Sequence, residues 1–518
     1  MDNYTNQDRT PSPVVRLQLP LLDRSVTTEI SEDYSLPDYQ PEIKRLLRVS
    51  ATVQPANRYV GGGAAEFSGT VDYCILYAGN DGQLYCFPQS ADYSFRVPLT
   101  AGPEFDLNDG LVVYALCEPE SVISRVSGPR RMSIKCRIGA KVRAYASCVR
   151  EEKRQGGAAP GEERLFREAE SGVVSWGISE PQTVTDEVIL EQEGGEWRVI
   201  SGESAVMMQD AVAGNGRVSC RGEVMLRLLL QKEGEGQAPV VMTRKIPFGG
   251  EVPVDGASVN GEAVATGYCT SLNLNMEEGR VLCDAEIVME ARSQRRETVS
   301  YTGDWYSIGT ESSCEMSECT LPVAIRCLNG NISLSESRSL EETGIAPAAR
   351  VIDVTGTAVV DGWETDRDRM VLTGRCRYTL ILSQEGELSA KEVEMPFRYL
   401  AEGIRGEEKP CAEAQVQILT ARARMDGERL AIDSELAVAL RLWKEQEIRM
   451  VSQVNVGETV ERPAGQTLLC YPAPGETLWA VAKRYHAGLD ALSDHNQVNT
   501  QCRADDPASL EGVRLLVI

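Results

Sequence analysis

The chain has 518 residues, of which 42% are hydrophobic, so it is long enough for several globular domains with cores of their own. Its net charge of −24 makes duplex nucleic acid and anionic membrane surfaces poor partners, because like charges repel. No apolar run reaches membrane-spanning length, and the first residues lack the basic and apolar regions of a secretory signal.

The fifteen cysteines and two histidines do not form a recognisable metal-binding pattern. No two cysteines are separated by only two residues, and several lie in strand-like segments where a free thiol packs as a small apolar group. We therefore expect reduced thiols, no metal site and no cofactor.

Residues 1–25 are polar and predict a flexible lead-in. The next segment, 36–53, begins with two prolines and continues with apolar residues at helical spacing, which predicts a short helix that leads into a strand. Those apolar residues are Ile43, Leu46 and Leu47. They could dock the segment on the first module, whereas its opening could be a recognition motif formed by Leu36, Pro37, Asp38 and Pro41.

One strand pattern occurs three times in the sequence, and each copy begins at a glycine, namely Gly69, Gly222 and Gly374. The second, fourth and sixth residues after each glycine are mostly apolar, which is the period of a strand with one face on a core. A glycine-containing turn follows, and the return strand is predicted to close at a proline, so each copy predicts a long hairpin. The three prolines are Pro98, Pro247 and Pro396.

The triplication predicts a mainly β fold with three tandem β-sandwich-like modules. Residues 150–164 are charged and rich in Gly and Ala, as in a linker or an exposed excursion. The predicted boundaries are a lead-in (1–25), module 1 (26–149), a linker (150–166), module 2 (167–300), module 3 (311–446), a linker (447–466) and a C-terminal unit (467–518).

The C-terminal unit predicts a β-α-α-β arrangement. Apolar residues at i, i+3, i+4 and i+7 mark one helix face: Leu478, Val481, Ala482 and Tyr485. Thr477 is placed to cap this helix, and Gly488 follows its end. A second short helix carries Leu489 and Leu492, and strands are expected at 468–471 and 514–518.

This unit resembles a LysM domain at Tyr471, Gly475, Glu476, Thr477, Leu478, Ala482, Tyr485, Leu492, Asn496, Gly512 and Leu515. The resemblance implies a partner- or glycan-binding site that includes Gly475, Glu476, Thr477, Trp479 and Asn496. Glu476 stands where the family usually has aspartate. Residues 497–509 replace the short polar loop that forms one wall of the family's glycan groove.

Trp479 lies in the first helical turn but off the apolar face. It could pack against a neighbouring module of the same chain, or it could be an exposed aromatic anchor for a partner. We expect the second role, in which Trp479→Ala folds but binds poorly.

The rest of the chain resembles SPOCS modules, named for spore coat assembly: LPDYQPEIKRLL (36–47) is similar to their opening motif, and the repeated hairpin is similar to their body. SPOCS modules followed by one LysM domain are the layout of spore coat morphogenetic proteins of the SipL and SpoVID type. The resemblance implies a non-enzymatic protein of the mother-cell cytoplasm that binds the coat ATPase SpoIVA and other coat proteins at the forespore surface.

The alternative function is a carbohydrate-binding LysM protein that recognises peptidoglycan or spore cortex glycan. An enzyme is disfavoured, because both histidines lie in the small C-terminal unit and the glycines at 61–63 lack the Lys-Ser/Thr of a phosphate-binding loop. Three modules could also give multivalent binding to coat proteins.

Overall fold

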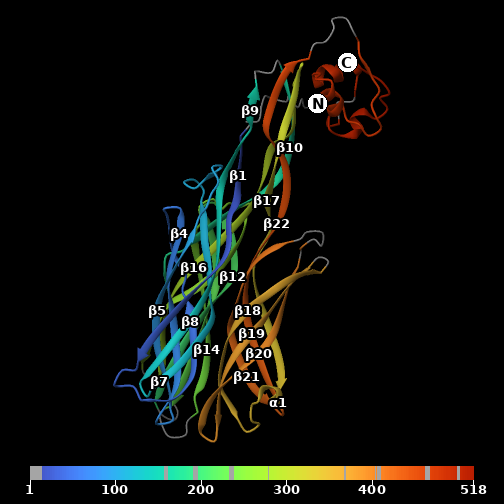
Figure 1. Cartoon of the computed structure of the whole chain (residues 1–518). Coiled ribbons are helices and arrows are strands. Elements are labelled where there is room, and N and C mark those ends of the chain that lie inside the picture. The colour runs from blue at the N-terminus through green and yellow to red at the C-terminus, as the bar shows by residue number, and fades with distance from the viewer. Residues whose placement is uncertain are drawn as a thin grey trace.

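The computed structural model describes residues 14–156, 161–190, 196–232, 238–277, 279–366, 369–402, 404, 410–460, 467–498 and 502–518. These residues are mainly β, as predicted, and form an elongated body with a small helical unit at one end (Figure 1). None of the helices in these ranges is long and apolar enough to cross a membrane.

The first unit of the body consists of two antiparallel sheets. One contains β1 (Val14–Ser35), β6 (Phe105–Asp106), β7 (Val112–Gly128) and β8 (Arg131–Glu151), and the other contains β2 (Ile43–Val53), β3 (Asn57–Gly61), β4 (Ala64–Gly79) and β5 (Leu84–Pro98). Apolar side chains of both sheets form one core, to which Phe67, Ile75 and Ile138 belong.

The second and third units repeat this plan, each with its own core. The second pairs β10 (Gly161–Ile178), β11 (Gln182–Ile189), β15 (Glu262–Glu277) and β16 (Arg280–Ile308) in one sheet, and β12 (Trp197–Gly214), β13 (Arg217–Lys232) and β14 (Val240–Pro253) in the other. In the third unit, one sheet contains β17 (Thr310–Ser339), β21 (Cys411–Asp426), β22 (Arg429–Thr459) and β9 (Lys153–Gly156). The other sheet contains β18 (Arg350–Asp366), β19 (Arg369–Gln384) and β20 (Glu387–Glu402). A short helix, α1 (Leu340–Thr343), follows β17.

The three predicted hairpins are present as β4–β5, β13–β14 and β19–β20. Each repeated glycine pairs in register with an aromatic residue of the return strand, giving Gly69–Tyr93, Gly222–Phe248 and Gly374–Phe397. A Cβ atom on these glycines would lie only 2.4–2.8 Å from the facing ring. The repeat therefore keeps glycine because an aromatic ring lies across it.

The predicted prolines mark the ends of the return strands in only one copy. β5 ends at Pro98, but β14 and β20 continue past Pro247 and Pro396. Both strands lie at sheet edges, where a residue without an N–H is tolerated inside a strand.

Replacing Gly374 with alanine is expected to lower the free energy of unfolding by about 1–3 kcal/mol, the usual cost of overpacking. The added Cβ would meet the Val359 carbonyl oxygen at 2.3 Å and the Phe397 ring at 2.4 Å. Gly362→Ala is the matched control, because no atom lies within 4 Å of a Cβ at that position. Denaturant unfolding of both variants checks this, and equal midpoints would contradict it.

The predicted lead-in and linkers are largely wrong in the described residues. β1 pairs with β8 along its length, so residues 14–25 are a strand, and residues 1–13 lie outside the described part. The first predicted linker contains the end of β8, all of β9 and the start of β10, and the second contains the end of β22. Residues 157–160 and 461–466 are outside the description.

The predicted linkers are strands because they belong to a stalk, which is formed by two ribbons of paired strands that extend beyond the cores of the three units. In one ribbon, residues 161–170 of β10 pair with 298–308 of β16, so module 2 does not end at residue 300. In the other, residues 310–320 of β17 pair with 447–459 of β22. The stalk rises above the body in Figure 1. The two ribbons pack on each other through a small buried cluster that includes Trp305, Val451 and Val454.

The predicted helix in 36–53 does not form, because Ile43–Val53 is strand β2. The register of β2 against β4 shifts twice, between Ile43 and Arg45 and between Leu46 and Arg48. Each bulge adds a residue, so the apolar positions acquire a spacing that imitates a helix.

The three units surround a common centre. Leu76, Leu229 and Ile381 each stand seven residues after their repeated glycine, and all three pack in one buried cluster. Equivalent positions of the three units thus meet, as around a pseudo-threefold axis. The body is an intramolecular trimer of β units.

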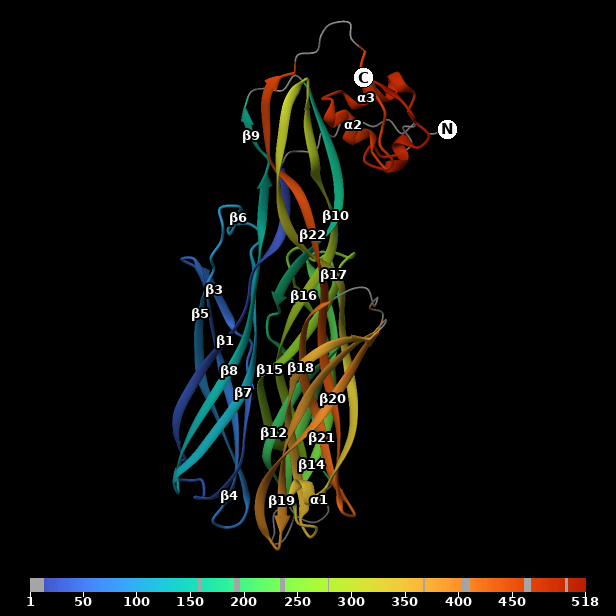
Figure 2. The same ribbon diagram turned by 45° about the vertical axis from the view of Figure 1, so that its right-hand side comes forward.

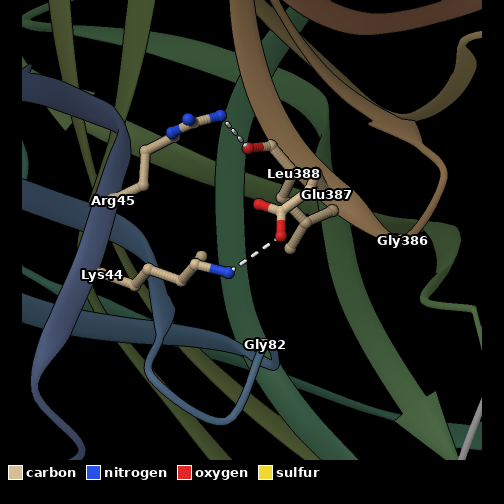
Figure 3. Close-up of a pocket in the computed structure, with 7 residues that line it drawn as sticks. Lys44, Arg45, Gly82, Gly386, Glu387 and Leu388 are labelled. Atoms are coloured by element: carbon tan, nitrogen blue, oxygen red, sulfur yellow. Dashed lines mark hydrogen bonds and ion pairs between the residues drawn. The ribbon is translucent and has the colours of Figure 1, made fainter.

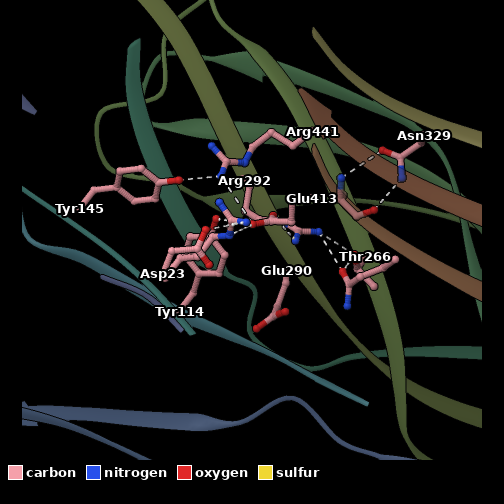
Figure 4. A network of polar contacts seen from close by, with 12 residues as sticks. Asp23, Tyr114, Tyr145, Thr266, Glu290, Arg292, Asn329, Glu413 and Arg441 are labelled. Carbon is pink, nitrogen blue, oxygen red and sulfur yellow. Dashed lines mark hydrogen bonds and ion pairs between the residues drawn. The ribbon is translucent and has the colours of Figure 1, made fainter. Parts of the chain in front are cut away.

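A second set of equivalent residues forms a buried charge cluster (Figure 4). Arg143, Arg292 and Arg441 each stand twelve residues after the arginine that opens β8, β16 or β22. All three converge on Glu413 of β21, with nitrogen–oxygen distances of 2.9, 2.7 and 3.5 Å. The Tyr114 hydroxyl also donates to this carboxylate, at 2.8 Å. Although burial opposes it, the three arginines lower the pKa of Glu413 to about 2.

Further ion pairs cross between the units. Arg48 of the first unit lies 3.1 Å from Glu203 of the second and 2.7 Å from Asp353 of the third. Near the opposite end from the stalk, Lys44 pairs with Glu387 at 3.0 Å (Figure 3). The cleft beside this pair has a free volume of about 10 Å³, far below that of a small-molecule site.

Candidate partner-binding unit

The C-terminal unit has the predicted β-α-α-β order. It consists of β23 (Leu469–Cys470), α2 (Leu478–Arg484), α3 (Leu489–Asn496), a 3₁₀ turn (Pro507–Leu510) and β24 (Leu516–Val517), which pairs antiparallel with β23. The side chains of Leu478, Val481, Ala482 and Leu492 are buried as expected, whereas Tyr485 at the end of α2 and Leu489 at the start of α3 are half-buried.

The residues 475–477 build the turn that starts α2. Gly475 has a positive φ of 79°, a conformation that favours glycine. The Glu476 carboxylate accepts from the Ala473 amide at 2.9 Å and pairs with Arg484. The Thr477 hydroxyl accepts from the Ala480 amide at 3.1 Å, which is the predicted N-cap.

Asn496 fastens α3 to the last strand. Its amide group donates to the carbonyls of Leu492 and Val517, both at 2.8 Å, and its oxygen accepts from the Val517 amide at 2.6 Å. The observed contacts of this residue hold the unit together.

The predicted groove wall lies across the amino end of α2, as far as it is described; residues 499–501 are outside that part. The Leu478 amide donates to the Ser509 hydroxyl at 3.1 Å, and the Trp479 amide donates to the Ala504 carbonyl at 2.9 Å. With the Thr477 cap, these bonds satisfy the first amides of the helix from within the chain.

Trp479 is buried, with 5% of its surface exposed, so the expectation of an exposed anchor is wrong. Its indole N–H donates to Asp304 of the stalk at 2.8 Å. Its ring packs edge-to-face on Tyr306, with centroids 5.0 Å apart. The sequence interpretation ended module 2 before these residues, and therefore missed the surface that covers the tryptophan.

Polar contacts complete this docking interface, and Figure 2 shows α2 and α3 beside the stalk. Lys483 pairs with Asp304, and the Tyr306 hydroxyl donates to the Ala487 carbonyl at 2.8 Å. The Leu489 amide donates to Glu163 of β10 at 2.9 Å. The C-terminal unit is thus fixed to the end of the body.

The outer face of β23 and β24 remains exposed. Leu469, Tyr471 and Leu515 show 53%, 73% and 40% of their surface there, while the intervening Cys470 and Leu516 point into the core. We call these three side chains the exposed apolar face. Neighbouring large apolar groups in contact with water are a common sign of an interaction site. The sequence analysis predicted the two strands but not this face, which the alternation around Cys470 and Leu516 could have indicated.

The candidate motif in the first unit is folded against that unit. Leu36 is buried and its amide donates to the Arg130 carbonyl at 2.8 Å, while the Pro37 carbonyl accepts from the Arg130 side chain. The Pro41 carbonyl accepts from Tyr77, whereas Asp38 is exposed. Strand β1, of 22 residues, leads from the stalk to this turn and spans about 70 Å. The two candidate sites are therefore far apart.

The assignment of a function to this chain rests on its own residues, because the sequence comparisons with known proteins give no match. No protein-family model matches the chain, and no curated protein sequence matches it. Among the described residues, no group of His, Cys, Asp and Glu side chains is arranged to hold a metal ion.

Proposed function

We propose that the chain is a non-enzymatic spore coat morphogenetic protein of the SipL and SpoVID type, with three SPOCS modules and a C-terminal LysM domain. In this role it binds the ATPase SpoIVA through the C-terminal unit, and helps to localise and encase coat proteins at the forespore surface from the mother-cell cytoplasm. The observation that carries the proposal is the exposed apolar face on a unit mounted at the end of a large β body.

A protein partner suits this face. Tyr471 is a large, amphipathic side chain of the kind that dominates binding energy at protein interfaces, and it directly follows β23 of the short sheet that also exposes Leu469. The body offers three related units for other coat proteins, so several weak contacts could act together.

The glycan alternative would use the turn at Gly475–Thr477 and Asn496. The polar groups of Glu476, Thr477 and Asn496 make internal bonds, and the start of α2 is covered by 504–509. We therefore favour the protein partner, with glycan binding as an outcome that the experiment can detect.

Calorimetric titration of the full chain with purified SpoIVA, and separately with soluble peptidoglycan fragments, tests the proposal. We expect binding to SpoIVA alone, and at least a roughly tenfold loss of affinity in Tyr471→Ser, since interface aromatics often contribute 2 kcal/mol or more. Tyr59→Ser is the control, because Tyr59 is a comparably exposed aromatic of β3 in the first unit. Binding to glycan alone, or equal loss in both variants, would contradict the proposal.

A further inference from the structure

Two thiols of the first hairpin lie in contact. Cys74 of β4 and Cys86 of β5 have their Sγ atoms 3.2 Å apart. Cys74 pairs across the ladder with Pro88, two residues from Cys86, so both side chains project from the same face. All fifteen cysteines of the chain are free in the structure, so Cys74 and Cys86 are two reduced thiols in direct contact.

We propose that Cys74 and Cys86 are a modification site, at which a small-molecule disulfide converts the two thiols into an intrachain disulfide. A disulfide bond is about 2.05 Å long, so the two sulfur atoms must approach by about 1 Å from their present separation. Side-chain rotation within the hairpin can supply this movement. The proposal is independent of the proposed spore coat role.

The fold itself does not require this pair. In the second hairpin, Arg227 and Val241 occupy the positions that correspond to Cys74 and Cys86, since Leu76 pairs with Cys86 and Leu229 pairs with Val241. In the third hairpin the corresponding residues are Thr379 and Ala390. Two neighbouring thiols are therefore specific to the first unit.

The pair lies at the seam between the first and second units. Cys86 packs against the cluster that joins the three units, and Glu203 of the second unit approaches Ser50 and Arg48 beside Cys74. Both cysteines are partly exposed, whereas Cys136 and Cys148 of the same unit are fully buried. A small oxidant in solution can therefore reach the pair before it reaches the core thiols.

The reaction is a thiol–disulfide exchange in two steps. Cys86 attacks one sulfur of the small disulfide as a thiolate, forming a mixed disulfide and releasing one small thiolate. Cys74 then attacks the Cys86 sulfur, which forms the Cys74–Cys86 bond and releases the second small thiolate. Two protein thiols are oxidised, the small disulfide is reduced, and the two protons pass to the released thiolates.

The order of attack follows from the surroundings of the two thiols. The hydrogen bond with Cys86 and burial raise the pKa of Cys74, which makes it the poorer first nucleophile at neutral pH. In the second step its attack is intramolecular and needs no diffusion, so proximity compensates for this.

Oxidised glutathione is the probe that tests the proposal on the reduced full chain. After incubation, free thiols are blocked with N-ethylmaleimide and the protein is digested and mapped by mass spectrometry. We expect a linked Cys74–Cys86 peptide, lighter by two hydrogen atoms than the reduced pair, while Cys136 is recovered as a thiol after denaturation.

Cys86→Ser is expected to abolish the linked peptide, and Cys148→Ser, which removes a buried thiol of the same unit, is expected to retain it. Because the wild-type chain supplies the main readout, a variant that fails to fold leaves the test intact. The proposal is overturned if Cys74 and Cys86 stay alkylatable while other cysteines react, or if either remains a mixed disulfide with glutathione.

Discussion

Replacing Glu413 with glutamine is expected to lower the free energy of unfolding of the body by about 3–5 kcal/mol, the usual cost of breaking a buried ion pair. The substitution keeps the shape but removes the single carboxylate on which Arg143, Arg292 and Arg441 converge. Each unit would then bury an arginine at the centre without this counter-charge. Denaturant unfolding followed by tryptophan fluorescence measures the change.

Glu394→Gln provides the control for this variant. Glu394 also pairs with an arginine, Arg375, but both side chains are exposed on the third unit. Exposed pairs contribute little, so the unfolding midpoint of the control should match that of the wild type. Equal destabilisation of the two variants would refute the special role of the buried cluster.

The same carboxylate predicts a pH dependence. Its folded pKa of about 2 lies below its ordinary value of 4.5, so its contribution is fully present above pH 4.5 and is lost as the pH falls through about 2. The stability difference between wild type and Glu413→Gln should therefore shrink on acidification. Unfolding at neutral pH and at about pH 3 checks this direction, and a difference that grows with acid would contradict it.

Trp479→Ala is expected to release the C-terminal unit from the stalk, because truncating a buried tryptophan typically costs about 3–5 kcal/mol. The variant loses the ring contact with Tyr306 and the bond to Asp304. Hydrogen exchange should increase in residues 304–308 and in α2, and stay unchanged in the strands of the three cores.

The control for this release is Trp363→Ala, since Trp363 is an exposed tryptophan of β18. It should leave exchange in the stalk unchanged. Because the buried Trp479 is not part of the exposed apolar face, Trp479→Ala should also keep its affinity for SpoIVA, unlike Tyr471→Ser. Unaltered exchange of residues 304–308 in Trp479→Ala would show that the docking does not depend on the indole.

Local patterns predicted the parts of the fold that depend on neighbours in sequence. The hairpins followed from the alternation after each glycine, and α2 followed from its cap at Thr477 and its apolar face. The strand β2 was mistaken for a helix because two bulges alter its period. The stalk was mistaken for linkers because residues 150–164 are charged and rich in Gly and Ala, and the partners that bury apolar stalk residues such as Trp305 and Val451 are far from them in sequence.

The contacts between units could not be predicted in the same way. Arg143, Arg292 and Arg441 stand at the same distance in sequence from the arginine that opens their strand, and this spacing could have identified them as equivalent. Their shared carboxylate could not be found, because the positions equivalent to Glu413 hold Tyr114 and Val264. The burial of Trp479 likewise depends on Asp304 and Tyr306, which are far from it in sequence.

The most direct test of the account compares the full chain with a chain that ends at Val460, each titrated with purified SpoIVA. Unfolding of the shortened chain first establishes that its body is intact. The account predicts that the full chain binds, that the shortened chain does not, and that excess soluble peptidoglycan fragments leave the binding unchanged. Equal binding by both chains, or displacement of SpoIVA by the glycan fragments, would contradict it.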